Sequence, residues 1–310
     1  MNRKILLTGS SGFIGKNLLQ NLYCLIDYSV VCSSRNIDKI GRNEYFVPLI
    51  DAQTDWSPLL SDIDYVVHLA GRAHQQNISD SSDQLYAYRK VNTDGVINLA
   101  RQAAESGIKR FIFISSIGVN GLGSRKPFRY DDAPSPQEPY AVSKYEAEVG
   151  LQKIAKETGM EIVIIRPPLV YAANAPGNFG KLTALAKNNL PLPLGAMDNK
   201  RSLVGIDNLV DLIITCIDHP KAANQTFLVS DDNDVSTSHL LRSMILSAGK
   251  TPFLLPVPIR ILRFFAGLLG KASVIDRMSS NLQIDISHTK STLGWKPPVS
   301  FEEGIRRCFK

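Results

Sequence analysis

Residues 4–15 read KILLTGSSGFIG, and this stretch decides the fold. The apolar run at 4–9 predicts a strand, and the pattern at 12–23 predicts a helix with one apolar face. Between them, Gly9, Gly12 and Gly15 recur three residues apart. Glycines in a strand–turn–helix unit let backbone amides approach a pyrophosphate at the positive end of the helix. The stretch therefore predicts a dinucleotide-binding loop; a packing turn in an unrelated α/β fold is the alternative.

Outward from this stretch, short β-branched runs alternate with helical patterns. Further strands are expected at 29–33, 44–50, 64–70, 110–116, 161–168 and 225–230, and a helix at 93–107. Near-continuous apolar strands separated by helices are typical of a parallel sheet covered on both faces. We predict an α/β fold, a doubly wound parallel Rossmann sheet with a smaller C-terminal substrate lobe. Residues 1–167 plus 206–230 would form the dinucleotide-binding domain, and residues 168–205 plus 231–310 the smaller lobe.

The composition is that of a globular protein, with 310 residues, 44% hydrophobic, 21% charged and a net charge of +6. No basic run with interleaved aromatic residues occurs, so nucleic acid is not expected as a partner. The histidines lack metal-ligand spacing and the cysteines lack a CxxC pair. We therefore expect no metal site, and reduced thiols in a cytoplasmic protein. The N-terminus shows no signal-peptide pattern.

The most apolar late stretch is PFLLPVPIRILRFFAGLLGKA, at residues 252–272. Prolines and two arginines interrupt it, and after Pro258 it is too short to span a bilayer. We expect a core or subunit-contact helix here and no integral membrane segment. A helix lying on a membrane surface is the alternative.

The second predicted strand ends in VVCSSRN, residues 30–36. An NAD-binding strand commonly ends in Asp or Glu, which holds the ribose hydroxyls. Ser34 stands at that place and Arg35 follows it, and a hydroxyl beside a guanidinium can receive a 2′-phosphate. NADP(H) is therefore favoured over NAD(H), with use of both, or an Arg35 that only stacks on adenine, as alternatives. Asp51, after the third predicted strand, is a candidate adenine contact.

The stretch PYAVSK, at 139–144, places Tyr140 and Lys144 on one face of a helix. Taken alone, the pair is ordinary on a solvated helix. A neighbouring ammonium favours the phenolate, however, and would bring a tyrosine toward useful basicity. FISSIG, at 113–118, supplies Ser115 and Ser116 at the end of a strand, where a hydroxyl can hold a substrate oxygen. The order of glycine loop, serine and Tyr-x-x-x-Lys therefore favours a catalytic pair.

At this point the chain resembles the extended short-chain dehydrogenase/reductase family nearly from end to end. The likeness rests on TGSSGFIG, HLAGRAH, VNTDG, FIFISS, PYAVSK, IIRPPLVY and KRSLVGIDNLVD. It implies that Ser116 holds the substrate hydroxyl, that Tyr140 is the acid/base, and that Lys144 binds the nicotinamide ribose and lowers the tyrosine pKa. By the same motifs the cofactor-binding residues would include Phe13, Ile14, Ala70, Gly71, Asn92 and Pro167. Those facing the diphosphate of a UDP-sugar would be Asn178, Arg201 and Arg277. A homodimer through helices that include residues 139–144 is also implied.

The resemblance also bears on the reaction. Sugar 4,6-dehydratases of the family carry an acidic pair after the catalytic hydroxyl, and this chain has Ile117 and Gly118 there, so dehydration is excluded. The chain is most similar to a UDP-glucose 4-epimerase-like branch that includes UDP-N-acetylquinovosamine dehydrogenases. Because Ser34 replaces the acid, we favour an NAD(P)-dependent 4-ketoreductase acting on a UDP-6-deoxy-N-acetylhexosamine in surface-polysaccharide synthesis. A UDP-glucose or UDP-N-acetylglucosamine 4-epimerase with retained NAD is the alternative, and a non-catalytic dinucleotide-binding protein a minor one.

Overall fold

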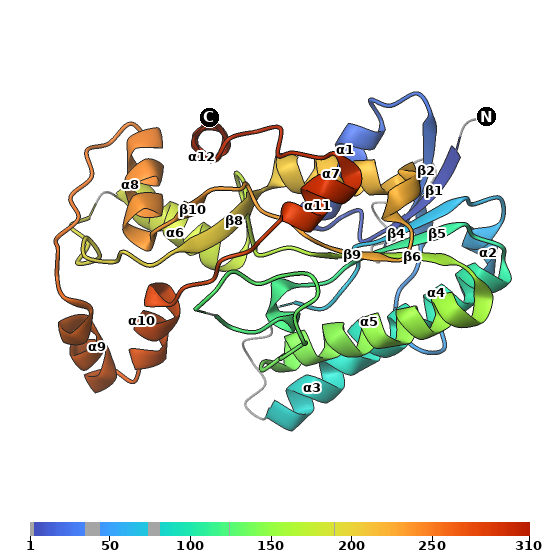
Figure 1. Cartoon of the computed structure of the whole chain (residues 1–310), viewed down its shortest axis with the longest axis horizontal. Coiled ribbons are helices and arrows are strands. Elements are labelled where there is room, and N and C mark those ends of the chain that lie inside the picture. The colour runs from blue at the N-terminus through green and yellow to red at the C-terminus, as the bar shows by residue number, and fades with distance from the viewer. Residues whose placement is uncertain (1–2, 35–43, 74–80, 124, 189) are drawn as a thin grey trace.

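The computed structural model describes residues 3–34, 44–73, 81–123, 125–188 and 190–310. Its centre is a seven-stranded sheet in the order β3-β2-β1-β4-β5-β6-β9, in which every paired strand is parallel (Figure 1). The strands are β1 (Arg3–Thr8), β2 (Tyr28–Ser34), β3 (Glu44–Phe46), β4 (Tyr65–His68), β5 (Arg110–Ile114), β6 (Glu161–Arg166) and β9 (Gln225–Leu228). The predicted doubly wound parallel sheet is thus confirmed.

Consecutive apolar side chains point to opposite faces of the sheet, so both faces are buried. In β1, Ile5 and Leu7 belong to one core cluster, whereas Leu6 belongs to the cluster on the opposite face. All three side chains are fully buried. A strand covered on both sides needs such a continuous apolar run, which explains the uninterrupted apolar stretches inside β1, β4, β5 and β6.

Helices cover the two faces of this sheet (Figure 1). One core cluster includes buried side chains of α1, α7 and α11, and the other includes those of α2, α4 and α5. The bounds are α1 (Phe13–Leu22), α2 (Ser57–Leu60), α3 (Ser81–Arg89), α4 (Gly95–Glu105), α5 (Pro139–Thr158), α7 (Ile206–Asp218) and α11 (Ser287–Leu293). Because all seven strands run in the same direction, their carboxyl ends lie at a common edge of the sheet, where ligands of such folds bind.

A smaller sheet lies beyond that edge. It has the order β10-β8-β7, with β7 (Leu169–Tyr171) parallel to β8 (Arg201–Gly205) and β10 (Asp234–Val235) antiparallel to it. Around it lie α6 (Gly177–Asn188), α8 (Thr237–Ser247), α9 (Ile259–Leu268), α10 (Ala272–Ser279) and α12 (Phe301–Arg307). Their shared core joins distant parts of the chain, from Tyr171 and Phe179 to Phe301 and Ile305. The predicted division into two domains stays a prediction.

Several predicted bounds differ from the structure for local reasons. The strand expected at 44–50 ends at Phe46, and Pro48 beyond it has no amide to donate to a ladder. The helix expected at 93–107 is preceded by a π-helical turn, Lys90–Asp94, before α4 begins at Gly95. A Cβ on Gly95 would lie 2.8 Å from the side chain of Ile50, so the close contact between the start of α4 and the segment after β3 needs glycine. Strand β8 was not anticipated.

Of the two roles predicted for a helix within residues 252–272, the core role is wrong, whereas the subunit-contact role stays a prediction. Helix α9 contains no buried residue, and its Phe264, Phe265 and Leu268 are exposed. It packs beside α10 at the outer end of the smaller lobe (Figure 1). In the residues that the structure describes, no helix combines the length and apolarity that crossing a membrane requires.

Candidate active site

The glycine loop follows β1 and opens α1. Gly9 has φ +75°, and a Cβ there would lie 2.6 Å from the backbone nitrogen of Ala70. A Cβ on Gly15 would lie 2.1 Å from the carbonyl oxygen of Gly9. The Gly12 amide donates to that same carbonyl at 2.9 Å. Only glycine fits this close turn, in which the backbone of the loop is drawn against the end of β4.

The start of α1 is suited to an anion. Gly12 caps the helix without a side chain, and the first turn carries no acidic residue. The first backbone amides of a helix lack intrahelical partners, and the helix dipole favours negative charge beside them. Within the described residues, the buried hydroxyls of Ser10, in the loop, and Ser115, after β5, have no hydrogen-bond partner. These features fit a bound dinucleotide phosphate and ribose.

A cleft of 1090 Å³ lies between the seven-stranded sheet and the smaller lobe. It brings together residues that are far apart in the sequence and that come from both sheets. Of the predicted site residues, those that line it are Phe13, Ile14, Gly71, Ser116, Tyr140, Lys144, Pro167, Asn178, Arg201 and Arg277. Ser115 also lines the cleft. The three predicted catalytic side chains therefore share one cavity with both arginines expected at a diphosphate.

Lys144 is the buried cation of this cleft. Its Nζ donates to the carbonyl oxygen of Ile114 at 2.9 Å and lies 4.5 Å from the ring centroid of Phe113. The Nζ is 6.0 Å from the ring centroid of Tyr140. Burial lowers the pKa of Lys144 to about 8, although the negative charge of Glu148 raises it in part. The ammonium is thus held at the floor of the cleft by the strand end of β5.

Tyr140 stands in the first turn of α5, directly after the helix-starting Pro139. Burial raises the pKa of Tyr140 to about 12, with a further contribution from Tyr88, whose ring meets the Tyr140 ring edge-on at 5.7 Å. Burial thus disfavours the phenolate, and the Lys144 ammonium lies 6.0 Å from the ring centroid. The expectation that Lys144 lowers the pKa of Tyr140 stays a prediction.

Ser116 caps a single 3₁₀ turn, Ile117–Val119, and its Oγ accepts from the Gly118 amide at 3.1 Å. The Ile117 amide donates to the carbonyl oxygen of Pro167 at 3.0 Å. A Cβ on Gly118 would lie 3.2 Å from that of Ala141 in α5. The turn after β5 is therefore packed against both β6 and the start of α5, which holds Ser116 and Tyr140 at the same wall.

A buried ion pair anchors α5 to β6 behind the catalytic candidates. Arg166 donates to both carboxylate oxygens of Glu148, at 3.0 and 2.6 Å, and to the side chain of Asn120 at 3.0 Å. The side chains of Arg166 and Glu148 are 5% and 2% exposed, so the pair is dry. Glu148 lies one turn after Lys144, and the pair therefore sets the position of both Lys144 and Tyr140.

Other predicted cofactor residues lie in the walls or away from the cleft. Asn92 is buried and bridges the backbone of Arg72 to the Ser143 hydroxyl. Ala70 abuts Gly9, and Ser34 is buried at the end of β2. The carboxylate of Asp51 accepts from Gln53 and Thr54 within its own turn. Arg35 lies outside the described residues, so its part in cofactor choice stays a prediction.

The far end of the cleft carries the charges expected for a diphosphate. Arg201 donates to the carbonyl oxygen of Arg277 at 2.8 Å, and burial together with the Arg277 charge lowers the pKa of Arg201. Arg277 lies 3.5 Å from the carboxylate of Glu138, the residue that caps α5. Glu138 was not anticipated, although its place directly before PYAVSK is a signal that could have found it.

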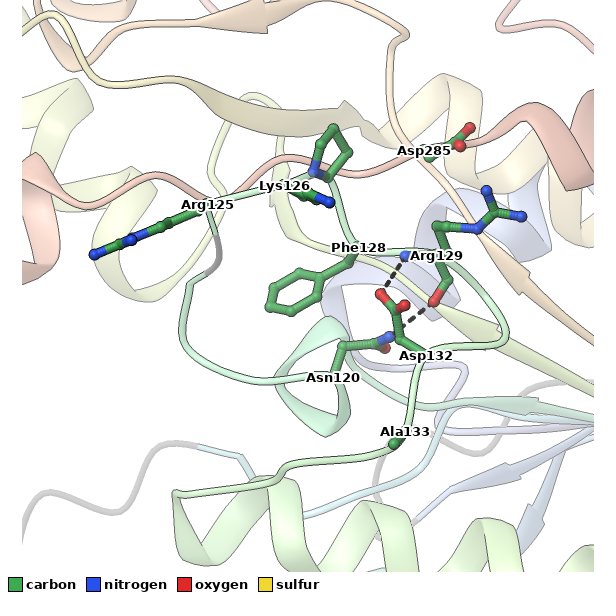
Figure 2. A pocket seen from close by; sticks show the side chains of 9 residues that line it. Asn120, Arg125, Lys126, Phe128, Arg129, Asp132, Ala133 and Asp285 are labelled. Atoms are coloured by element: carbon green, nitrogen blue, oxygen red, sulfur yellow. Dashed lines mark hydrogen bonds between the residues drawn. The ribbon is translucent and has the colours of Figure 1, made fainter.

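Two further arginines at the cleft, Arg72 and Arg125, were also missed. Arg72 directly follows Gly71 in the HLAGRAH motif, whereas nothing in the sequence marks Arg125. Arg125 also lines a neighbouring hollow (Figure 2), in which the Asp132 carboxylate accepts from the Arg129 amide at 2.7 Å. Asn120 donates to the Arg129 carbonyl oxygen at 3.0 Å in the same hollow. These bonds shape the loop that forms one wall of the cleft.

Comparison with known proteins agrees with this geometry. A family model described as the NAD dependent epimerase/dehydratase family matches residues 5–230. The chain belongs to this family. Its members are enzymes, so a catalytic protein with a nicotinamide dinucleotide cofactor is confirmed. The resemblance to the extended short-chain dehydrogenase/reductase family is confirmed as well.

Individual members of the NAD dependent epimerase/dehydratase family resemble the chain over nearly its whole length. A protein of Vibrio cholerae named UDP-glucose 4-epimerase is 49% identical over 99% of the chain and 94% of its own length. An N-acetyl-α-D-glucosaminyl-diphospho-ditrans,octacis-undecaprenol 4-epimerase of Escherichia coli O157:H7 is 26% identical. This match covers 100% of the chain and 95% of the relative's own length. The structure of UDP-glucuronic acid 4-epimerase from Bacillus cereus with NAD matches with a TM-score of 0.77 at 22% identity. The match covers 99% of the chain and 97% of that structure's chain. The two sequence relatives favour the 4-epimerase alternative over the ketoreductase, and the solved structure shows the shared fold.

Proposed function

We propose that the protein is an NAD-dependent 4-epimerase of a UDP-hexose. The observation that carries the proposal is the cleft in which Ser116, Tyr140 and Lys144 meet opposite Arg201 and Arg277. Its two ends offer a proton donor for a sugar hydroxyl and two cations for a diphosphate. The identity of 49% with a UDP-glucose 4-epimerase favours this reaction among those that the cleft could support.

The glycine loop and the cleft fit a nicotinamide dinucleotide. The start of α1 would hold the pyrophosphate, and the unsatisfied hydroxyls of Ser10 and Ser115 would bond to the cofactor. Lys144 would bind the nicotinamide ribose. A nicotinamide dinucleotide held by these residues would supply a reversible hydride acceptor for C4 of the sugar.

Tyr140 would move the proton of the sugar O4. With a pKa of about 12, the phenol is protonated near neutral pH and can donate to that oxygen. When Tyr140 instead accepts the proton, the positive charge of Lys144 stabilises the phenolate. Ser116, fixed by the Gly118 amide, would hold O4 in place.

Arg201 and Arg277 would bind the diphosphate, and Asn178 would add an amide donor from α6. The charge repulsion between the two arginines is relieved when a doubly negative group lies between them. Arg277 would exchange Glu138 for the diphosphate when substrate binds, since its present contact with Glu138 is largely exposed. We further propose a cytoplasmic location and a homodimer through α5.

A 4-ketoreductase remains the second candidate, because Ser34 ends β2 where an NAD-holding acid is expected. Its substrate would be a UDP-4-keto-6-deoxy-N-acetylhexosamine, and its cofactor would exchange at each turnover. NADP(H) would then be preferred.

One experiment separates the two. The purified protein is denatured, and any released nicotinamide cofactor is identified. Untreated protein is then given UDP-glucose, UDP-N-acetylglucosamine or the 4-keto sugar with NADPH or NADH. Retained NAD and interconversion of C4 epimers without net oxidation support the epimerase. Stoichiometric oxidation of NADPH with the 4-keto sugar would instead establish the ketoreductase. In either case Tyr140→Phe should abolish turnover and leave cofactor affinity unchanged.

A further inference from the structure

Helix α9 presents large apolar side chains to solvent. We call the exposed side chains of Ile261, Phe264, Phe265, Leu268 and Leu269 the α9 surface. Phe264 is 64% exposed, Phe265 60%, Leu268 70% and Leu269 74%. On the other side of the helix, Ile259 and Leu262 pack against the core of the smaller lobe. A helix that is apolar on both sides is normally covered by something on both sides.

Basic residues accompany this surface. Residues 253–272 contain three basic residues, Arg260, Arg263 and Lys271, and no acidic residue, and Asp276 follows in α10. Arg260 lies one helical turn before Phe264, on the same stripe of the helix. Asp276 is already paired with Arg263 at 2.9 Å. Aromatic and aliphatic side chains flanked by Lys and Arg are the composition of helices that lie in the interface of anionic membranes.

The shape and the charge argue against a second copy of the chain as the occupant. α9 and α10 form the outer tip of the lobe, away from the seven-stranded sheet (Figure 1). In a two-fold dimer the same patch faces itself, so the basic side chains of the two copies would be brought together. A projecting tip with a basic flank meets no such repulsion at a negatively charged bilayer, where the side chains enter the interface and the cations meet the headgroups.

We propose that the α9 surface binds an anionic lipid bilayer. Phe264, Phe265, Leu268 and Leu269 enter the headgroup region, and Arg260 and Lys271 contact the lipid phosphates. Helix α10 packs beside α9, and its Ser273, Asp276 and Arg277 line the cleft. Binding therefore places the mouth of the cleft close to the membrane surface. The inference rests on α9 alone and does not depend on which reaction the cleft performs.

Sedimentation with vesicles tests the proposal. The full-length protein is mixed with vesicles of phosphatidylcholine and phosphatidylglycerol, or of phosphatidylcholine alone. We expect binding to the anionic vesicles that weakens with salt. Replacing Phe264 and Phe265 together by Ser should weaken it by about tenfold or more, since each ring contributes burial free energy. Replacing Arg260 and Lys271 by Gln should weaken it about fivefold per charge. Tyr86→Ser, which removes a 73% exposed ring elsewhere, should change nothing.

A second measurement, tryptophan fluorescence, distinguishes loss of lipid binding from misfolding of the variants. Trp56 and Trp295 are buried, so Phe264→Trp would add an exposed reporter with a conservative change. Its emission should shift to shorter wavelength with anionic vesicles. Three outcomes would overturn the proposal: no binding to anionic vesicles, equal binding to both vesicle types, or a dimer in lipid-free sedimentation velocity that the double Phe replacement dissociates. The last would identify a second copy as the occupant.

Discussion

Removing the charge of Glu148 should destabilise the fold far more than removing a similar surface charge. The carboxylate accepts two bonds from Arg166 in a site where both side chains are at most 5% exposed. In Glu148→Gln the remaining oxygen still accepts one bond from Arg166. The new side-chain NH₂ group, however, faces an N–H of the guanidinium, and the guanidinium charge is left without a counterion. Breaking a buried pair in this way costs about 3 kcal/mol of unfolding free energy, the low end for such pairs because one bond survives. Urea denaturation measures the loss.

The same helix offers a matched control, Glu146→Gln. Glu146 also binds an arginine through several short bonds, but Arg89 and Glu146 have side chains 45% and 31% exposed. Water and salt screen that pair, so its loss should change the unfolding free energy by at most about 1 kcal/mol. Glu148→Gln should also lower the pKa of Lys144 further, because the Glu148 charge is what raises it. Equal losses of stability in the two variants would refute the reasoning from burial.

Three further predictions concern the loop and the titrating groups. Gly15→Ala puts a Cβ 2.1 Å from the Gly9 carbonyl oxygen, so equilibrium dialysis should show lost NAD affinity, whereas Gly267→Ala, with open space around it, should leave affinity intact. Lys144 has a pKa of about 8 in the fold against 10.5 in the open chain, so the unfolded state binds more protons between these values. Stability should rise with pH there in cofactor-free protein, and a rise that persists in Lys144→Met would contradict the assignment. Burial lowers the pKa of His68 from 6.5 to about 3, so stability should fall as pH falls through that range, and His68→Asn should flatten the fall in denaturation curves.

The sequence predicted best what depends on local pattern. The glycine loop, β1, β5 and the helix that carries Tyr140 and Lys144 occur where periodicity and spacing placed them, because each is set by neighbours within a few residues. Ser116, Tyr140 and Lys144 share a cleft as expected, since strand ends and helix starts meet at one edge of a parallel sheet.

What the sequence could not predict depends on long-range contacts. Glu138 and Arg277 are far apart in the sequence, and only the fold brings their side chains to within 3.5 Å. The short segment of β8 has no clear strand pattern in the sequence, and it forms a strand because β7 and β10 pair with it. Residues 252–272 are apolar enough for a core, yet the fold leaves α9 at the tip of the lobe. The pKa of Tyr140 follows from its burial beside Tyr88, a ring that lies on another helix.

The composition of the smaller core has a consequence for the order of events during synthesis. Tyr171 packs edge-on against Phe301, and a Cβ on Gly304 would meet the Tyr171 hydroxyl at 2.5 Å. Six of the seven parallel strands have been made by Arg166, so most of the large sheet can form while the chain is still growing. The smaller core must wait for α12, which is made after every strand of the large sheet. The nascent chain therefore exposes apolar surface around β7 and α6 until α12 has been made. Removal of residues 301–310 should leave a folded sheet with an unfinished, aggregation-prone lobe.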